Sequence, residues 1–300
     1  MQGAGIADLR KGAGRAGVCI AAFLAVIFFI LPAGAKPQRI VSTNVCADQL
    51  ALLLAPERVV SVSFNAADPN ISNFAAAAKN IPINAARAEE IVLLKPDLVL
   101  GDVYEGASVT RFAEVSGIPV QLVGPGTSIA DVRKIVRDAA LAVGERARGE
   151  AAIAAMDARL KAIKRDGRDV RALVYEPSGI TSGTGTLTNE LLAAAGLHTL
   201  APELMSGSYG AVPLELVITA APDLLIVDDA YGGGQSNAQR LLRHPALRAL
   251  REHTRLTSIP SRLWLCPGPW IAEAAERLAA EKTRVPDSTL EPLAGRSIQE

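Results

Sequence analysis

Two stretches of this chain repeat one another on either side of a long segment without proline. Glu89–Leu100 can be laid on Glu215–Ile226, since each begins with glutamate, continues as a short apolar helix face and passes through Pro-Asp into a strand-like run. The segment between them, Glu145–Arg165, has its larger apolar residues at spacings of three and four, which predicts an amphipathic helix about 30 Å long. The repeat therefore predicts two similar lobes joined by one helix.

Short apolar runs alternate with amphipathic stretches along the rest of the chain, which is typical of parallel sheets flanked by helices. The predicted strands are Arg39–Ser42, Arg58–Val62, Asp97–Leu100, Val120–Val123, Arg171–Tyr175, Asp223–Val227 and Ser261–Leu265. The predicted helices are Asp48–Ala55, Glu89–Lys95, Ser108–Ser116, Ser128–Val143, Thr188–Ala195, Leu214–Ala221, Gln239–Arg251 and Ile271–Thr283. We predict an α/β fold with an N-terminal lobe at 36–144, a linking helix at 145–166, a C-terminal lobe at 167–284 and a flexible tail at 285–300.

Residues 1–35 have the order of a cleavable signal peptide. Basic residues precede the apolar run Val18–Leu31, and the small residues Ala33-Gly34-Ala35 follow it. The run is shorter than the roughly 20 residues that span a bilayer, which favours cleavage after Ala35 over an uncleaved anchor. Cys19 lies at the start of the run rather than after it, so we expect a periplasmic protein that is not a lipoprotein.

The charges of the chain are balanced, with 31 basic and 31 acidic residues, so we expect no nucleic-acid partner. Motifs of hydrolases such as Gly-x-Ser-x-Gly and His-Glu-x-x-His are absent from the sequence. Asp228 and Asp229 follow a predicted strand, but no nucleophile or base completes a catalytic site with them. We therefore predict a protein that is not an enzyme, with no resident cofactor and no metal site of its own.

Several polar and aromatic residues lie just after the predicted strands, where ligands of open α/β sheets bind. Aromatic side chains in such loops are costly to expose unless they cover something. Facing loops of two lobes would form a cleft suited to a large, partly apolar ligand. Alternatively, several of these aromatic rings cap the cores of their own lobes. The predicted ligand-binding residues are Asn44, Cys46, Phe64, Tyr104, Tyr209, Asp229, Tyr231, Cys266 and Trp270.

Cys46 and Cys266 each follow a predicted strand, one in each lobe, and the periplasm favours disulfides. A disulfide between them would need Cα atoms within about 7 Å and would join the lobes. We rank free thiols on the rim of the cleft slightly ahead of a disulfide, and ligation of a soft metal centre behind both.

The pattern Arg39-Ile40-Val41-Ser42, the block Glu89–Val99 and the linking helix resemble the helical-backbone periplasmic binding proteins for ferric siderophores, haem and cobalamin. The turn Thr181-Ser182-Gly183 and the second block at Pro222-Asp223 fit the same pattern, so the resemblance covers nearly the whole chain after the signal peptide. It implies a monomer with little hinge motion, which holds its ligand between the lobes and delivers it to the permease subunits of an ABC transporter at the inner membrane.

The resemblance also implies roles for single residues. Glu89 and Glu215 correspond to the family's transporter-docking glutamates, and Phe64 and Tyr209 to aromatic residues that pack on cobalamin, with Trp270 less securely placed. Haem-binding members often supply a Tyr or His ligand to the iron. In this chain Tyr104, Tyr209 and Tyr231 are the candidates for that role.

The chain departs from receptors for strongly anionic chelates, which line the cleft with several basic residues. Its predicted strand-end loops hold little beyond Arg262. We expect a cobalamin-like or ferric-chelate ligand that itself carries the iron or cobalt. The alternatives are an exported enzyme or a sensor acting on a similar chelate.

Overall fold

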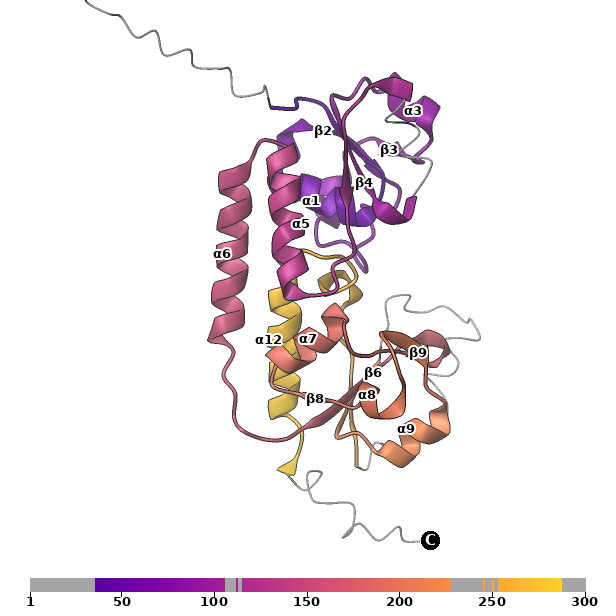
Figure 1. Ribbon diagram of the computed structural model, residues 1–300, viewed down its shortest axis with the longest axis vertical. Helices are drawn as coiled ribbons and strands as arrows, with labels where there is room; N and C mark the ends of the chain where they lie inside the picture. The colour runs from indigo at the N-terminus through magenta and orange to yellow at the C-terminus, as the bar shows by residue number, and fades with distance from the viewer. Residues whose placement is uncertain are drawn as a thin grey trace, which may run out of the picture. The chain divides into compact units, whose positions relative to one another are not determined.

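The computed structural model describes residues 36–105, 112, 115–227, 245, 250 and 253–287 (Figure 1). Lys36–Glu300 forms one compact unit. The limits of the two lobes within this unit remain those predicted from the sequence. Most residues of the predicted helices Ser108–Ser116 and Gln239–Arg251 lie outside the described residues. The predicted ligand-binding residues Asp229 and Tyr231 also lie outside them. Within the described ranges, no helix has the length and hydrophobicity that crossing a membrane requires.

The N-terminal lobe is built on a parallel sheet with the strand order β3-β2-β1-β4-β5. Its strands are β1 (Ile40–Ser42), β2 (Val59–Ser63), β3 (Ile83–Asn84), β4 (Leu98–Asp102) and β5 (Val120–Val123). Its helices are α1 (Val45–Leu54), α2 (Ala75–Ala78), α3 (Ala88–Leu93) and α5 (Ile129–Ala142), with 3₁₀ turns η1 (Pro56–Arg58) and η2 (Val103–Glu105). Side chains alternate across the sheet. Ile40 and Leu98 therefore join the main core, whereas Val41 and Val99 pack with Ile91 of α3 in a smaller outer cluster.

The C-terminal lobe has a four-stranded parallel sheet, β11-β10-β6-β8, and an antiparallel pair, β7–β9. Its strands are β6 (Arg171–Tyr175), β7 (Ile180–Ser182), β8 (His198–Thr199), β9 (Tyr209–Ala211), β10 (Leu224–Val227) and β11 (Arg255–Thr257). Its helices are α7 (Leu187–Ala194), α8 (Ala201–Leu204), α9 (Leu214–Ala220) and α12 (Ile271–Thr283), with 3₁₀ turns η3 (Pro177–Gly179) and η5 (Ser261–Leu263). The predicted strand at Ser261–Leu265 was wrong. The backbone N–H groups of Trp264 and Leu265 both donate to the carbonyl of Ser261, which closes a turn, and β11 is the strand beside β10.

The linking helix is α6 (Arg146–Ala162), which begins one residue later and ends earlier than predicted. It lies against α5 and then against α12 (Figure 1). Gly149 allows close contact with α5, because a Cβ atom there would lie 2.4 Å from the Cβ of Ala140. Ile153 and Met156 are buried, which confirms the predicted narrow apolar stripe. One rigid element thus contacts helices of both lobes.

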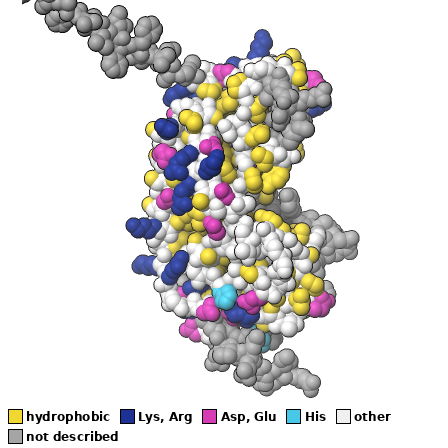
Figure 2. Space-filling model, in the orientation of Figure 1, with side chains coloured by type: hydrophobic (Ala, Val, Ile, Leu, Met, Phe, Trp, Pro, Cys, Tyr) yellow, Lys and Arg dark blue, Asp and Glu magenta, His cyan; other side chains and the backbone are white. Residues whose placement is uncertain are grey.

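Basic side chains gather over α5 and α6 on the face shown in Figure 2. Acidic residues neutralise them, as in the ion pairs Arg137–Glu150 at 2.8 Å and Arg159–Glu276 at 2.6 Å. Such exposed pairs contribute about 0–1 kcal/mol each. The paired arginines therefore join α6 to α5 and to α12.

The first residues of the predicted flexible tail contact the C-terminal lobe. Val285 is buried, and its carbonyl accepts a 2.5 Å hydrogen bond from the guanidinium of Arg168. The same guanidinium pairs with the exposed Asp287 at 3.2 Å. The start of the tail is therefore attached to the lobe.

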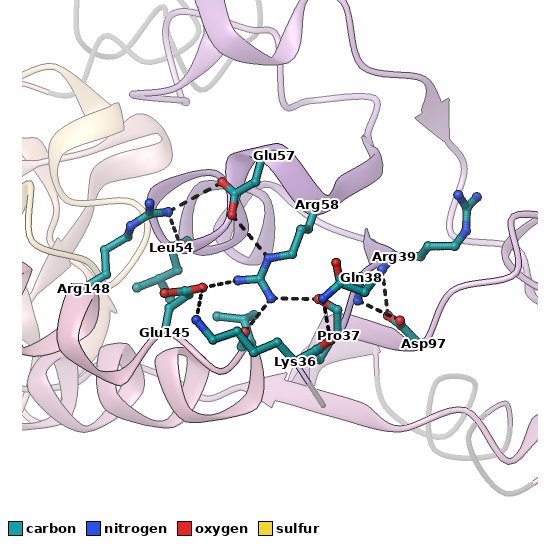
Figure 3. A network of polar contacts seen from close by, with 11 residues as sticks. Lys36, Pro37, Gln38, Arg39, Leu54, Glu57, Arg58, Asp97, Glu145 and Arg148 are labelled. Atoms are coloured by element: carbon teal, nitrogen blue, oxygen red, sulfur yellow. Dashed lines mark hydrogen bonds and ion pairs between the residues drawn. The ribbon is translucent and has the colours of Figure 1, made fainter. Parts of the chain in front are cut away.

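The sequence repeat corresponds to a repeat of hydrogen bonds. In the N-terminal lobe, the Asp97 carboxylate accepts from the backbone N–H groups of Gln38 and Arg39, at 2.7 and 2.8 Å (Figure 3). The guanidinium of Arg39 donates to the carbonyls of Leu94 and Lys95, at 2.8 and 3.1 Å. Those carbonyls follow α3, so this arginine–aspartate clamp ties the end of the helix to the starts of β1 and β4.

The C-terminal lobe forms the same clamp with other residues. The Asp223 carboxylate accepts from the backbone N–H of Arg171 at 2.9 Å. The guanidinium of Arg171 donates to the carbonyls of Ala220 and Ala221, at 2.9 and 3.5 Å. Ala221 has a φ of 42° and Lys95 a φ of 48°, so α9 and α3 both end in a left-handed residue. The two lobes are therefore similar in detail as well as in class.

Candidate ligand-binding site

A disulfide joins the two lobes. Cys46 lies in the first turn of α1, Cys266 follows η5, and their Cα atoms are 5.1 Å apart across a sequence separation of 220 residues. Both sulfur atoms take part in the disulfide, so the prediction that ranked free thiols ahead of a disulfide was wrong. The sequence places each cysteine after an element of its own lobe, but the distance between them depends on how the lobes meet.

Trp270 and Asn44 make their contacts within the protein beside this disulfide. Trp270 is only 8% exposed, and its ring meets the edge of Phe74 with centroids 6.0 Å apart. Its indole N–H donates to the carbonyl of Cys266 at 2.8 Å. The side-chain oxygen of Asn44 accepts from the backbone N–H of Cys46 at 3.0 Å and caps α1. A ligand contact by either residue stays a prediction.

Further contacts between the lobes surround the disulfide. Arg262 donates its backbone N–H to the carbonyl of Asn70 at 3.1 Å, and its carbonyl accepts from the Asn73 amide at 2.6 Å. Gly126 lies so close to Pro267 that an added Cβ would be 2.4 Å from the proline ring. One buried apolar cluster contains residues of both lobes. We call this region the junction; no sequence motif marked Asn70 or Asn73 as part of it.

Three of the predicted aromatic residues are exposed at the ends of strands. Phe64 follows β2 and Tyr104 follows β4 in the N-terminal lobe, and Tyr209 begins β9 in the C-terminal lobe; their exposed fractions are 70%, 80% and 64%. Although the side chain is largely exposed, partial desolvation of the Tyr209 phenol raises its pKa, and the nearby Glu176 and Tyr104 raise it further. Tyr104 and Tyr209 are therefore within electrostatic reach of each other although they belong to different lobes.

Buried carboxylates hold the loops that carry the two N-terminal aromatic residues. Asp48 accepts from the backbone N–H and the hydroxyl of Ser63, at 3.0 and 2.5 Å, immediately before Phe64. Asp102 accepts from the backbone N–H of Tyr104 at 2.7 Å. Both carboxylates are buried and hold the backbone of these loops, whereas the aromatic rings of Phe64 and Tyr104 are exposed. A buried aspartate cannot be told from an exposed one in the sequence alone, so this support was not predicted.

The two predicted docking residues occupy matching positions. Glu89 and Glu215 are each the second residue of a short helix, α3 and α9, and both are exposed. Within the described part of the chain, neither carboxylate has a hydrogen bond or an ion pair. The charge of Glu215 adds to burial in raising the pKa of Tyr175. The described residues also contain no group of three His, Cys, Asp or Glu that could hold a metal ion.

The sequence matches the family model described as periplasmic binding protein over residues 40–261. The chain belongs to the periplasmic binding protein family. This confirms the resemblance inferred from the repeated blocks and places the protein in the periplasm. The family is one of solute-binding proteins. A search of curated proteins found no match.

Solved structures of periplasmic binding proteins share the two-lobed fold. The heme-binding protein RhuT from Roseiflexus sp. RS-1 matches with a TM-score of 0.69 and 24% identity, over 85% of this chain and 99% of that one. A possible iron-binding protein from Staphylococcus epidermidis matches with a TM-score of 0.66 and 18% identity, over 83% and 99%. The vitamin B12 binding protein BtuF of Vibrio cholerae matches with a TM-score of 0.61 and 17% identity, over 83% and 98%.

Proposed function

We propose that this periplasmic binding protein is the capture component of an ABC importer for a cobalamin-like or ferric-chelate ligand, siderophore or haem. The observation that carries the proposal is the set of exposed rings Phe64, Tyr104 and Tyr209 at the strand ends of two lobes, with two of the rings in electrostatic reach. Aromatic faces supply large contact areas for flat, partly apolar molecules, and phenol groups add hydrogen bonds or a ligand to iron. The mature protein would begin at Lys36, after removal of a signal peptide.

The similarity to binding proteins for heme, vitamin B12 and iron supports this ligand class. The rigid support of the aromatic loops also favours binding, since a pre-formed site loses little entropy when the ligand enters. An exported enzyme or a sensor acting on a similar chelate is the alternative. Release of an altered chelate by the isolated protein would favour the enzyme.

Delivery of the ligand would use Glu89 and Glu215. Each carboxylate is exposed on the outer layer of its lobe and lacks a partner among the described residues. An unpaired, exposed carboxylate is what a residue that pairs with a cation of another protein would present. We propose that the permease subunits supply those cations, with the binding protein acting as a monomer.

Ligand titration tests the proposal. The mature protein, from Lys36 onward, is titrated with hemin, cyanocobalamin and a ferric hydroxamate while visible absorption and tyrosine fluorescence are recorded. We expect one of these probes to bind, and Tyr104→Ala with Tyr209→Ala to weaken that binding by at least tenfold. Leu141→Ala, an exposed change on α5, is the matched control. The proposed ligand class would be contradicted if none of the three probes binds, or if the double variant binds as tightly as the wild type.

A further inference from the structure

Glu89 borders an apolar groove on the outside of the N-terminal lobe. The groove has a volume of about 880 Å³. Its described lining includes Glu89, Val92, Leu93, Phe112, Val115 and Ile118. Leu93 and Val115 are each 81% exposed, so most of their apolar surface is in contact with water. Contiguous exposed apolar surface of this kind marks an interaction site.

The packing of the lobe explains why this surface stays exposed. The outer face of the sheet buries only a small cluster, Val41, Ile91, Val99 and Phe112. Ile91 is the one residue of α3 that is buried, which leaves Val92 and Leu93 on the outside of the helix. The clamp of Arg39 on the end of α3 fixes the helix in this position. The α3 wall of the groove is thus held in place by the clamp.

In the C-terminal lobe, the residue aligned with Leu93 is polar. Glu215 borders a cavity of about 410 Å³ that is also lined by Ser178 and Pro213. The repeat aligns Leu93 with Thr219, whose hydroxyl donates to the carbonyl of Glu215 at 2.8 Å. The two glutamates therefore lie in matched positions, but a threonine stands where Leu93 lines the N-terminal groove.

We propose that the groove beside Glu89 receives an apolar side chain of the permease, next to the cation that pairs with the glutamate. The inference rests on the proposed function and names the chemistry of its partner. A carboxylate without a described partner on the rim of an apolar groove is complementary to a segment that presents a cation and an apolar side chain together. Because Glu215 repeats the carboxylate in the second lobe, the partner must offer a cation to each lobe. Paired permease subunits meet that requirement.

Exchange of the aligned residues tests whether the groove takes part in docking. Leu93→Thr gives the N-terminal groove the residue of the C-terminal lobe, and Thr219→Leu makes the reverse change. Leu141→Thr, which alters a 65% exposed leucine on α5 outside the groove, is the control. Binding of the mature protein is measured by interferometry to the host's chelate-importer permease–ATPase complexes in nanodiscs. We expect Leu93→Thr to weaken binding roughly tenfold or more, since burial of a leucine accounts for at least that factor. Thr219→Leu should retain or strengthen binding, and Leu141→Thr should change it by less than about twofold.

The outcomes separate the groove from the importer role. If the wild type binds and Glu89→Arg with Glu215→Arg abolishes binding, but Leu93→Thr binds normally, the groove inference is overturned and the importer role stands. If the wild type binds none of the complexes, the importer role fails, and the groove inference fails with it. A second copy of the chain is the other occupant to test. Concentration-dependent dimers in sedimentation that disappear with Leu93→Thr would also overturn the inference.

Discussion

In the N-terminal lobe the aspartate of the clamp, Asp97, is exposed, whereas its equivalent in the C-terminal lobe, Asp223, is buried. The hydrogen bonds are alike, but the layers around them differ. Among the described residues, the outer cluster of the N-terminal lobe has four buried members and that of the C-terminal lobe has eight. The repeat has thus kept the geometry that ends a helix and begins a strand, while the described residues of the two outer layers pack differently. The groove beside Glu89 lies on the outer layer of the N-terminal lobe.

The largest expected effect on the free energy of unfolding concerns the junction, where the two lobes are joined by the disulfide. Replacement of both cysteines, Cys46→Ser with Cys266→Ser, should lower the free energy of unfolding by about 3–5 kcal/mol, since a bond that closes a loop this long restricts the unfolded chain strongly. Urea unfolding followed by tryptophan fluorescence measures the change, because Trp270 packs beside the bond. Reductant should destabilise the wild type by a similar amount and leave the double variant unchanged. A wild type insensitive to reductant would mean that the junction is stable without the disulfide.

A smaller effect should distinguish the two clamps. Asp223→Ala removes a buried carboxylate that accepts from the backbone of Arg171, and we expect a loss of about 2–3 kcal/mol. Asp97→Ala removes an exposed acceptor of the same geometry and should cost about 1 kcal/mol. Equal losses in urea unfolding would show that burial does not separate the clamps. Asp138→Ala serves as the control, because the ion pair of Asp138 with Lys134 is local to α5 and its side chains are 41% and 74% exposed.

Much of the fold could be predicted from periodicity. The predicted limits of β5, β6 and α12 are those of the structure, because each is long enough for its apolar pattern to repeat. The strands β3 and β8 were missed, since two residues have no period to read. Ser261–Leu265 was misassigned because its alternating Leu263 and Leu265 imitate a strand, whereas the backbone closes a 3₁₀ turn there.

The candidate site was predictable in part. Phe64 and Tyr104 are exposed after their strands, as the strand-end rule predicts. Trp270 was expected to follow the misassigned strand Ser261–Leu265, but it precedes α12 and is buried, because it fills the junction against Phe74. Contacts of this kind depend on how two lobes meet, and a pattern within one segment carries no information about that. The same limit applies to the pairing of the two cysteines.

The smallest expected effect compares the two ends of the linking helix, each of which is held by an acidic residue. Glu145, before α6, pairs with Lys36 at 2.9 Å and with Arg58 at 2.7 Å (Figure 3). Asp166, beyond the other end, pairs with Lys282 of α12 at 2.7 Å. The hydrogen bond from Lys36 lowers the pKa of Glu145, and that from Lys282 lowers the pKa of Asp166.

Because both pKa values are lowered on folding, each carboxylate stabilises the fold fully above its ordinary pKa, 4.5 for Glu145 and 3.8 for Asp166, and the contribution is lost as pH falls through the folded-state value. Glu145→Gln should therefore be less stable than the wild type at pH 7, and the difference should shrink to nothing as pH falls well below 4.5. Asp166→Asn should behave alike, and its difference from the wild type should disappear as pH falls well below 3.8. Thermal unfolding from pH 7 to pH 3 measures both. A difference that stays constant with pH in either variant would show that shape rather than charge holds that end of the helix.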